Sequence, residues 1–154
     1  IQNRILSPSD FGFHNALKRG SETVFLDFEY FGWDDPVKTI SDFIIHPGMD
    51  LTEEMKRRFV SLMLNNFATS DELLIRLRYL YPLFGLKWCL ILLNEFLPES
   101  LHRLEFVSGG SVDKTSLQRV QLQKSMSVLG KLRQGFERFP YCDQFYEFSF
   151  QPIR

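Results

Sequence analysis

The sequence predicts a single, mainly helical domain with one small β-hairpin near its N-terminal end. A chain of 154 residues lies in the usual size range for one domain and can bury a substantial core. Helical hydrophobic patterns fill most of the chain after Asp35, whereas short apolar runs and polar turns alternate before it. The chain is 44% hydrophobic and 24% charged, which is ordinary for a globular protein and argues against intrinsic disorder.

The hairpin is predicted from two apolar runs that flank a polar turn. The runs are residues 14–17 and 23–28, and the turn is residues 18–22. The second run contains the strongest strand formers of this region, Val24 and Phe25 among them. A short extended piece at residues 4–6 leads into the preceding loop, because Pro8 biases Ser7 away from a helical conformation.

Three helices are predicted from capping signals between residues 35 and 82. Asp35-Pro36 is typical of a helix start, and that helix should end at Ile45, before His46. Thr52 opens the second helix, and Thr69 with Glu72 forms a capping box for the third. The side chains expected to face the core are Met55, Phe59, Leu62 and Met63 in the second helix, and Leu73, Leu74, Leu77 and Leu80 in the third.

The chain after residue 82 predicts two more long helices. Residues 83–96 are apolar nearly all round, so we expect this helix to be central. A short helix is expected within residues 98–106. The last helix is expected over residues 113–139, where Gly130 and Gly135 lower the helix propensity. We expect the aromatic tail, residues 141–150, to pack against the rest of the domain. The apolar stripe expected to face inward in the last helix is Leu117, Val120, Leu122, Met126, Leu129 and Leu132.

Charge, cysteine content and hydropathy narrow the functional classes. A net charge of −1 gives no support to nucleic-acid binding, which needs a basic surface. The longest apolar stretch, residues 80–97, is interrupted by Pro82 and Lys87, so we expect a buried helix and no membrane partner. Cys89 and Cys142 lack metal-ligand spacing and are expected to be free thiols in a reducing cytoplasm.

Three polar residues near the N-terminal end stand out because they interrupt apolar sequence. Asp10, Asn15 and Asp27 lie among phenylalanines at loops or strand ends, and a hairpin would return Asp27 towards Asn15. A carboxylate in such surroundings is costly unless it is paired, and Mg²⁺ pairs well with oxygen ligands. Each residue alone is also explained as a turn, strand-start or capping residue, and the set favours a shared cation site.

The motifs around these residues resemble those of a known enzyme family. Asp10 is followed five positions later by Asn15, and an apolar strand ends in Leu26-Asp27-Phe28-Glu29, after which Asp35-Pro36 follows. The chain is similar in this to the C-terminal lobe of the aminoglycoside phosphotransferase and choline kinase-like family, relatives of protein kinases. The resemblance implies that residues 1–36 hold the catalytic loop, hairpin and metal-binding segment, and that residues 37–154 form the helical subdomain.

The resemblance also implies an activity, namely transfer of the γ-phosphate of ATP or GTP to a hydroxyl of a small molecule. Asp10 would be the catalytic base, and Asn15 and Asp27 would hold Mg²⁺ and, through it, the nucleotide. Glu29 could reach a second Mg²⁺ through water. An amino-alcohol or aminoglycoside-like substrate, bordered by Tyr30, Trp33 and Asp34, is one possibility that it raises.

The chain also departs from the family pattern. Pro8 stands where the family has a histidine, Ser9 where it has a glycine, and the sequence contains no glycine-rich phosphate loop or strand lysine. We therefore expect a nucleotide-binding N-terminal lobe outside this sequence, without which the chain alone should be inactive. One alternative is a non-catalytic, pseudokinase-like interaction module. The other is a helical scaffold in which Asp10, Asn15 and Asp27 lie far apart.

The histidines are expected to have structural roles. His14 should be a hydrogen-bonded loop residue, His46 should cap a helix C-terminus, and His102 has no evident partner.

Overall fold

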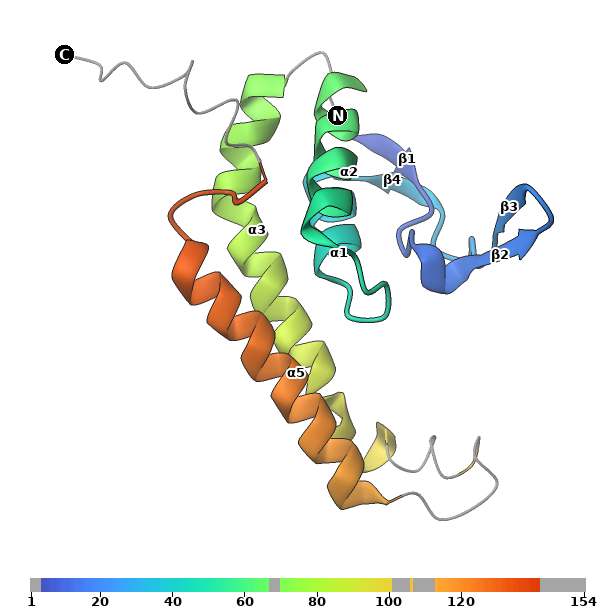
Figure 1. The fold of residues 1–154 in the computed structure, drawn as a ribbon, viewed down its shortest axis with the longest axis vertical. Coiled ribbons are helices and arrows are strands. Elements are labelled where there is room, and N and C mark those ends of the chain that lie inside the picture. Colours follow the sequence, from blue (N-terminus) through green and yellow to red (C-terminus); the bar gives the residue numbers. More distant parts are fainter. Residues whose placement is uncertain (1–3, 67–69, 101–105, 107–112, 142–154) are drawn as a thin grey trace.

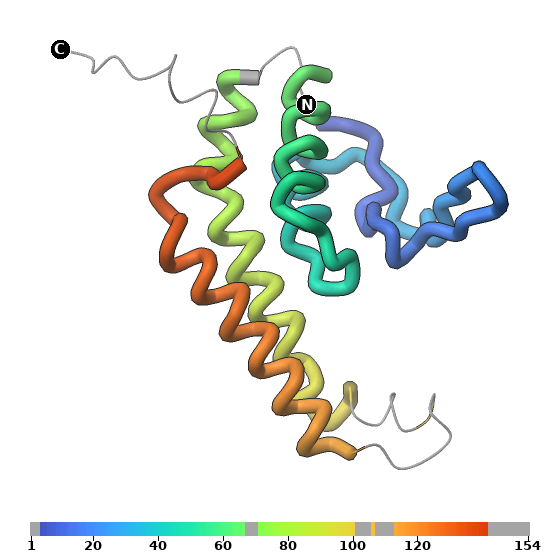
Figure 2. The backbone as a smooth tube through the Cα atoms, viewed as in Figure 1, coloured from blue at the N-terminus to red at the C-terminus, as the bar shows by residue number. Residues whose placement is uncertain are grey.

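The computed structural model describes residues 4–66, 70–100, 106 and 113–141. It is mainly helical, with two small antiparallel sheets of two strands each (Figures 1 and 2). The strands are β1 (Ile5–Ser7), β2 (Ala16–Arg19), β3 (Glu22–Phe25) and β4 (Gly32–Asp34). The helices are η1 (Phe13–Asn15), α1 (Pro36–Ile45), α2 (Glu53–Asn66), α3 (Ser70–Leu92), η2 (Asn94–Phe96) and α5 (Lys114–Gly135).

The predicted hairpin is confirmed, with a tighter turn than expected. Strands β2 and β3 pair from Ala16↔Phe25 to Arg19↔Glu22, so the turn consists of Gly20 and Ser21 only. Gly20 has a φ of 62°, a left-handed conformation that favours glycine and explains the residue at this position. The first predicted strand began too early, because residues 13–15 form the short helix η1.

The second sheet was not predicted. Strand β1 pairs with β4 in the register Ile5↔Asp34, Leu6↔Trp33 and Ser7↔Gly32. This ladder closes the segment between its strands, including the catalytic-loop candidate and the hairpin, into one N-terminal unit beside α1 (Figure 1). The hairpin itself projects away from the helices.

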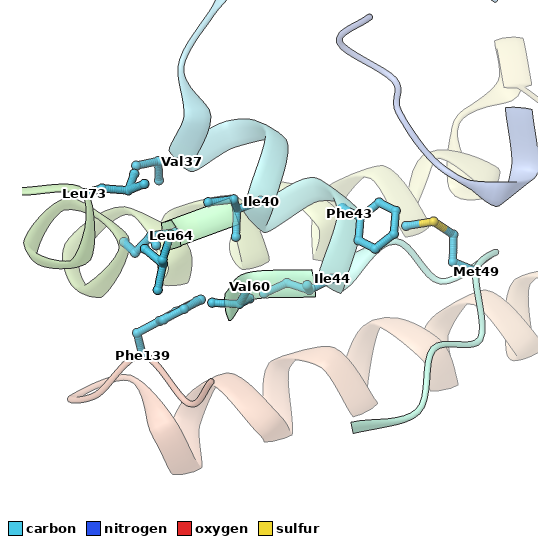
Figure 3. Close-up of a cluster of buried hydrophobic side chains, with 10 residues drawn as sticks. Val37, Ile40, Phe43, Ile44, Met49, Val60, Leu64, Leu73 and Phe139 are labelled. Atoms are coloured by element: carbon cyan, nitrogen blue, oxygen red, sulfur yellow. The ribbon is translucent and has the colours of Figure 1, made fainter. Parts of the chain in front are cut away.

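Helix α1 has the predicted bounds and is the central helix of the core. The Asp35 carboxylate accepts a hydrogen bond from Val37 N (2.9 Å), Pro36 occupies the first turn, and His46 is the C-cap. Its buried side chains pack against α2, α3 and Phe139, as Figure 3 shows. The core cluster comprises Val37, Ile40, Phe43, Ile44, Met49, Val60, Leu64, Leu73, Leu77 and Phe139.

The third and fourth predicted helices are a single helix, α3, with Pro82 inside it. A proline removes one hydrogen bond and usually ends a helix, but both halves of α3 are held by packing, on α1 and on α5. The prediction that residues 83–96 form a separate helix was wrong, whereas one face of this segment is buried as expected, at Trp88, Cys89 and Leu92. Leu83, Leu86 and Leu90 are exposed, so the apolar character of this segment exceeds what the described residues bury.

The predicted inward faces were right for α3, right in part for α2, where Phe59 and Met63 pack against the core, and displaced in α5. Leu73 and Leu77 are buried as expected, whereas α2 buries Val60 and Leu64 while Met55 and Leu62 are exposed. In α5, only Leu132 of the predicted stripe is buried, and Ser125 faces the protein in its place. The exposed members of that stripe are Val120, Leu122, Met126 and Leu129. Helix α5 ends at Gly135, earlier than expected.

Some predictions fall wholly or largely outside the described residues. These concern Thr69, most of the short helix at 98–106, His102, Cys142 and the tail beyond Tyr141. Tyr141 itself does pack back, with its ring 5.7 Å from that of Phe139. Cys89 is a buried free thiol. Among the described helices, none combines the length and hydropathy that crossing a membrane requires.

Candidate functional site

The loop that carries Asp10 is fixed to helix α1 by two polar anchors. Ser7, which is buried, shares a hydrogen bond between its Oγ and Thr39 Oγ1 (3.2 Å) and also accepts one from Ser9 N (3.0 Å). Lys38 Nζ donates to the main-chain oxygen of Ser9 (3.2 Å) and to its Oγ (2.9 Å). These bonds hold Ser9 at a φ of 68°, a left-handed conformation that turns the chain into Asp10.

Lys38 also ties this loop to strand β4. Its Nζ lies 2.9 Å from Asp34 Oδ2 and 3.5 Å from Asp42 Oδ2. Asp34 accepts a further hydrogen bond from Asp35 N, so its carboxylate is committed to the β4–α1 junction. The sequence suggests Asp34 as a residue at the edge of a substrate pocket. Its contacts give it a structural role.

Asp10 and Asn15 lie together, as the sequence predicted. Asn15 Nδ2 donates to the main-chain oxygen of Asp10 (3.0 Å) and to Asp10 Oδ2 (3.2 Å). The amide nitrogen therefore faces Asp10, and within the described part of the chain Asn15 Oδ1 accepts no hydrogen bond. Asp10 is about half exposed, with a side-chain exposure of 50%. A carboxylate and an amide oxygen are thus held side by side at an accessible surface.

Two histidines complete this site, His14 within the loop and His46 at the end of α1. His14 Nε2 lies 3.1 Å from Asp10 Oδ1, which confirms the expectation of a hydrogen-bonded loop histidine. The His14 ring stacks on His46, with centroids 3.9 Å apart and planes only 6° from parallel. His46 also caps α1, as predicted, and its Nδ1 accepts a hydrogen bond from Gly48 N (3.1 Å). Burial, and secondarily the nearby His14, lower the pKa of His46, which favours its neutral form.

A partly buried polar cluster on α1 and α3 lies on the other side of His46. Asp42 accepts hydrogen bonds from Trp88 Nε1 (2.7 Å) and from Lys87 Nζ (2.7 and 2.9 Å). The ring of Trp88 meets that of His46 edge-on, with centroids 4.6 Å apart. Because Asp42 fixes Trp88, it also limits where His46 can lie.

A sulfur contact joins the two loops that carry these histidines. Phe13 N donates to Met49 Sδ (3.3 Å), and the sulfur lies so near Gly12 that a Cβ there would be 2.6 Å away. The same Cβ would be 2.6 Å from the His14 ring. Gly12 is therefore required by close approach, because any side chain would separate the loops.

The structure places Asp27 near Asn15 along the main chain but shows no contact between their side chains. Leu26 N donates to Asn15 O (2.8 Å), which extends the β2–β3 ladder and leaves Asp27 one residue beyond it. Asp27 has a φ of 60° and follows the end of β3. Tyr30, whose pKa is raised by a hydrogen bond and charge from Glu29, and Trp33 are both exposed on open surface.

A cavity of about 350 Å³ lies elsewhere, between α1, α2, α3 and α5. Its lining includes the Glu53–Lys56 ion pair, Lys131, Tyr81 and Tyr141, and none of residues 10–15. The candidate site is therefore an open surface and not the floor of this cavity.

Comparison of the chain with models of known protein families, with curated proteins and with solved structures gave no match. Any functional conclusion thus depends on the residues themselves. Sequence reasoning placed Asp10 beside Asn15 correctly and missed the role of His46 beside His14. No local signal could reveal that contact, because it joins two loops separated by the hairpin, β4 and α1.

Proposed function

We propose that this chain is the catalytic lobe of a small-molecule kinase, which transfers the γ-phosphate of ATP or GTP to a substrate hydroxyl. The observation that carries the proposal is the contact between Asp10 and Asn15. A phosphotransferase needs a carboxylate to orient and deprotonate the hydroxyl, with oxygen ligands for Mg²⁺ beside it. Both groups are present at one accessible surface.

The hydrogen bonds of Asp10 are compatible with its role as the base. Each carboxylate oxygen accepts one described hydrogen bond, from His14 or from Asn15, and a carboxylate offers about four lone-pair sites in all. Capacity therefore remains for a substrate hydroxyl. The two bonds fix the orientation of the carboxylate, which is what a positioned base requires.

Asn15 and Asp27 are the proposed ligands of Mg²⁺. The donor set suits this ion, because Mg²⁺ prefers carboxylate and carbonyl oxygens and usually keeps several waters. Asn15 turns its nitrogen towards Asp10 and so keeps its carbonyl oxygen for a cation. When bound, Mg²⁺ neutralises negative charge on the phosphates. Asp27 reaches it from the end of the hairpin.

The exposed apolar side chains of the N-terminal unit support a partner lobe. Large apolar residues on or next to both small sheets are exposed, which is typical of an interaction surface. A nucleotide-binding lobe, carried by a longer form of the protein, would cover them and supply the phosphate-binding loop and lysine. The exposed residues are Leu6, Leu17, Val24, Phe28, Tyr30 and Trp33.

The second candidate is a non-catalytic, pseudokinase-like interaction module. The engagement of both Asp10 oxygens within the loop favours it, as does Pro8 in place of the usual histidine. The two candidates differ in their response to nucleotide. A kinase should bind ATP in a Mg²⁺-dependent manner, and an interaction module should not.

The test is phosphoryl transfer by the full-length protein over a panel of hydroxyl-bearing metabolites. We expect Asp10→Asn and Asp27→Asn each to lower turnover by about 10²-fold or more. Asp71→Asn is the matched control, because Asp71 is exposed in the first turn of α3, outside the loops that carry Asp10 and His46. Calorimetry with MgATP completes the experiment. Full activity of Asp10→Asn would remove the proposed base, and absence of Mg²⁺-dependent binding would favour the interaction module.

A further inference from the structure

The Asp10 loop and the adjoining end of α1 together offer a second set of ligand atoms, different from the proposed Mg²⁺ ligands. Asp10, His14 and His46 each offer one carboxylate oxygen or imidazole nitrogen, and these atoms all lie within 4.8 Å of one another. Two imidazoles and one carboxylate form a donor set typical of zinc and other first-row transition metals. Mg²⁺ prefers oxygen ligands and should bind only weakly to this donor set.

Contacts within the protein hold these side chains in place. Asp10 and His14 are bonded to each other at 3.1 Å, and His46 is confined by Trp88 on one side and His14 on the other. Each imidazole also lies against a glycine of its own loop. A Cβ at Gly12 would be 2.6 Å from the His14 ring, and one at Gly48 would be 3.0 Å from that of His46. The site is therefore assembled from two loops that the Phe13–Met49 contact already joins.

The movement that coordination needs is small and can be specified. With bonds of about 2.0–2.1 Å, the ligand atoms of a tetrahedral zinc site lie roughly 3.3 Å apart, so the widest pair must approach by at most about 1.5 Å. The parallel rings must also turn relative to each other, because two parallel planes cannot both contain one ion. His46 Nδ1 accepts a hydrogen bond from Gly48 N, so the neutral ring carries its proton on Nε2. Coordination through Nε2 would move that proton to Nδ1, and coordination through Nδ1 would use its lone pair, so either mode breaks the Gly48 bond.

We propose that Asp10, His14 and His46 bind a divalent transition-metal ion of the zinc class, with water in the open position. The carboxylate of Asp10 coordinates the ion. If the proposed function holds, the ion therefore inhibits phosphoryl transfer by removing the base, and only this second clause rests on that function. Zinc binding and catalysis by Asp10 exclude each other, whereas Mg²⁺ on Asn15 and Asp27 uses other atoms.

The first experiment measures metal binding alone and needs neither nucleotide nor substrate. Purified protein is titrated with Zn²⁺ against a chromophoric chelator and with Co²⁺ by visible absorption. We expect one ion per chain and the intense Co²⁺ bands of a four-coordinate site. His14→Gln and His46→Gln should each weaken Zn²⁺ binding at least about 10-fold. His102→Gln is the matched control and should leave the affinity unchanged, as should the double variant Cys89→Ser with Cys142→Ser, which excludes thiol binding.

A measurement on the unsubstituted protein guards against variants that fail to fold. In NMR spectra, Co²⁺ should shift or broaden the ring resonances of His14 and His46, and the Gly48 amide should lose its protection from exchange. Equal Zn²⁺ affinity in His14→Gln, His46→Gln and His102→Gln would overturn the site, as would ring resonances of His14 and His46 that Co²⁺ leaves unchanged. Because no activity is measured, failure here leaves the proposed kinase function standing, and an inactive protein leaves the metal site standing.

Discussion

The N-terminal unit and the α3–α5 pair are held together in different ways. In the N-terminal unit, side-chain hydrogen bonds connect segments that are distant in sequence, such as Ser9 with Lys38. Helices α3 and α5 run antiparallel and touch along close-packed small residues, where Ser125 Oγ donates to Cys89 O (3.1 Å) (Figure 1). Substitutions in the first region should therefore alter the site more than the stability, and substitutions in the second should do the reverse.

The largest effect expected is the loss of activity on substitution of Asp10 in the intact protein. Asp10→Asn should lower turnover by about 10²–10⁴-fold, the usual contribution of a positioned general base. The free energy of unfolding should change by less than about 1 kcal/mol, because Asp10 is half exposed and the loop keeps its anchors to α1. Parallel turnover assays and urea melts check both parts. A melt that shifts as strongly as the activity falls would contradict the division between the two regions.

The next largest effect is expected in α5, where two leucines of the same helix can be compared. Leu132 is 7% exposed and packs on Gly85, whereas Leu129 is 37% exposed. Leu132→Ala should lower the free energy of unfolding by about 2–5 kcal/mol through lost burial and a cavity. Leu129→Ala should cost less than about 1 kcal/mol. Denaturant melts of both variants decide the point, and equal costs would mean that the buried row of α5 is wrongly assigned.

A second pair of substitutions tests how closely the two helices approach. A Cβ at Gly85 would lie 2.5 Å from a methyl group of Leu132, whereas one at Gly130 would meet nothing within 4 Å. Gly85→Ala should therefore destabilise the protein by about 1–3 kcal/mol through overpacking. Gly130→Ala should stabilise it by about 0.5–1 kcal/mol, because alanine loses less entropy in a helix. Opposite shifts in melting temperature are the expected readout. Shifts of the same sign would rule out the close contact.

These contrasts also explain which parts of the structure the sequence could predict. Local signals sufficed to predict the turn at Gly20 and the start of α1 at Asp35–Pro36, because each depends on residues only a few positions apart in the sequence. The Asp10–Asn15 contact is similarly local. The β1–β4 ladder and the His14–His46 stack are not local, and no periodicity encodes them.

The error in α5 has a physical cause of a different kind. An apolar stripe predicts the buried face when helices pack through large side chains. Helices α3 and α5 approach instead through Gly85, Cys89 and Ser125, so the small and polar row faces inward. The Ser125 hydroxyl donates there to a main-chain oxygen, so its burial leaves no hydrogen-bond donor unpaired. A hydrophobicity pattern does not predict the burial of such a polar residue.

The smallest effect expected is a loss of stability in alkali, carried by two tyrosines beside the cavity. Burial raises the pKa of Tyr81 to about 12, and it also raises that of Tyr141. Above pH 10 the unfolded chain loses protons that the folded protein keeps, so stability is complete below pH 10 and falls as the pH rises towards 12. At pH 11 each tyrosine should contribute a loss of at most about 1.4 kcal/mol.

Tyr81→Phe isolates this effect, because phenylalanine keeps the ring packing against Phe139 and removes the titrating group. The slope of unfolding free energy against pH between 10 and 12 should become shallower in this variant. Tyr79→Phe is the matched control, since Tyr79 is exposed on the same helix and should leave the slope unchanged. Identical slopes in Tyr81→Phe and the unsubstituted protein would show that the cavity admits enough water to ionise Tyr81. The α3–α5 pair would then be as open to solvent as the loop that carries Asp10, and the difference between the two regions would lie in their contacts alone.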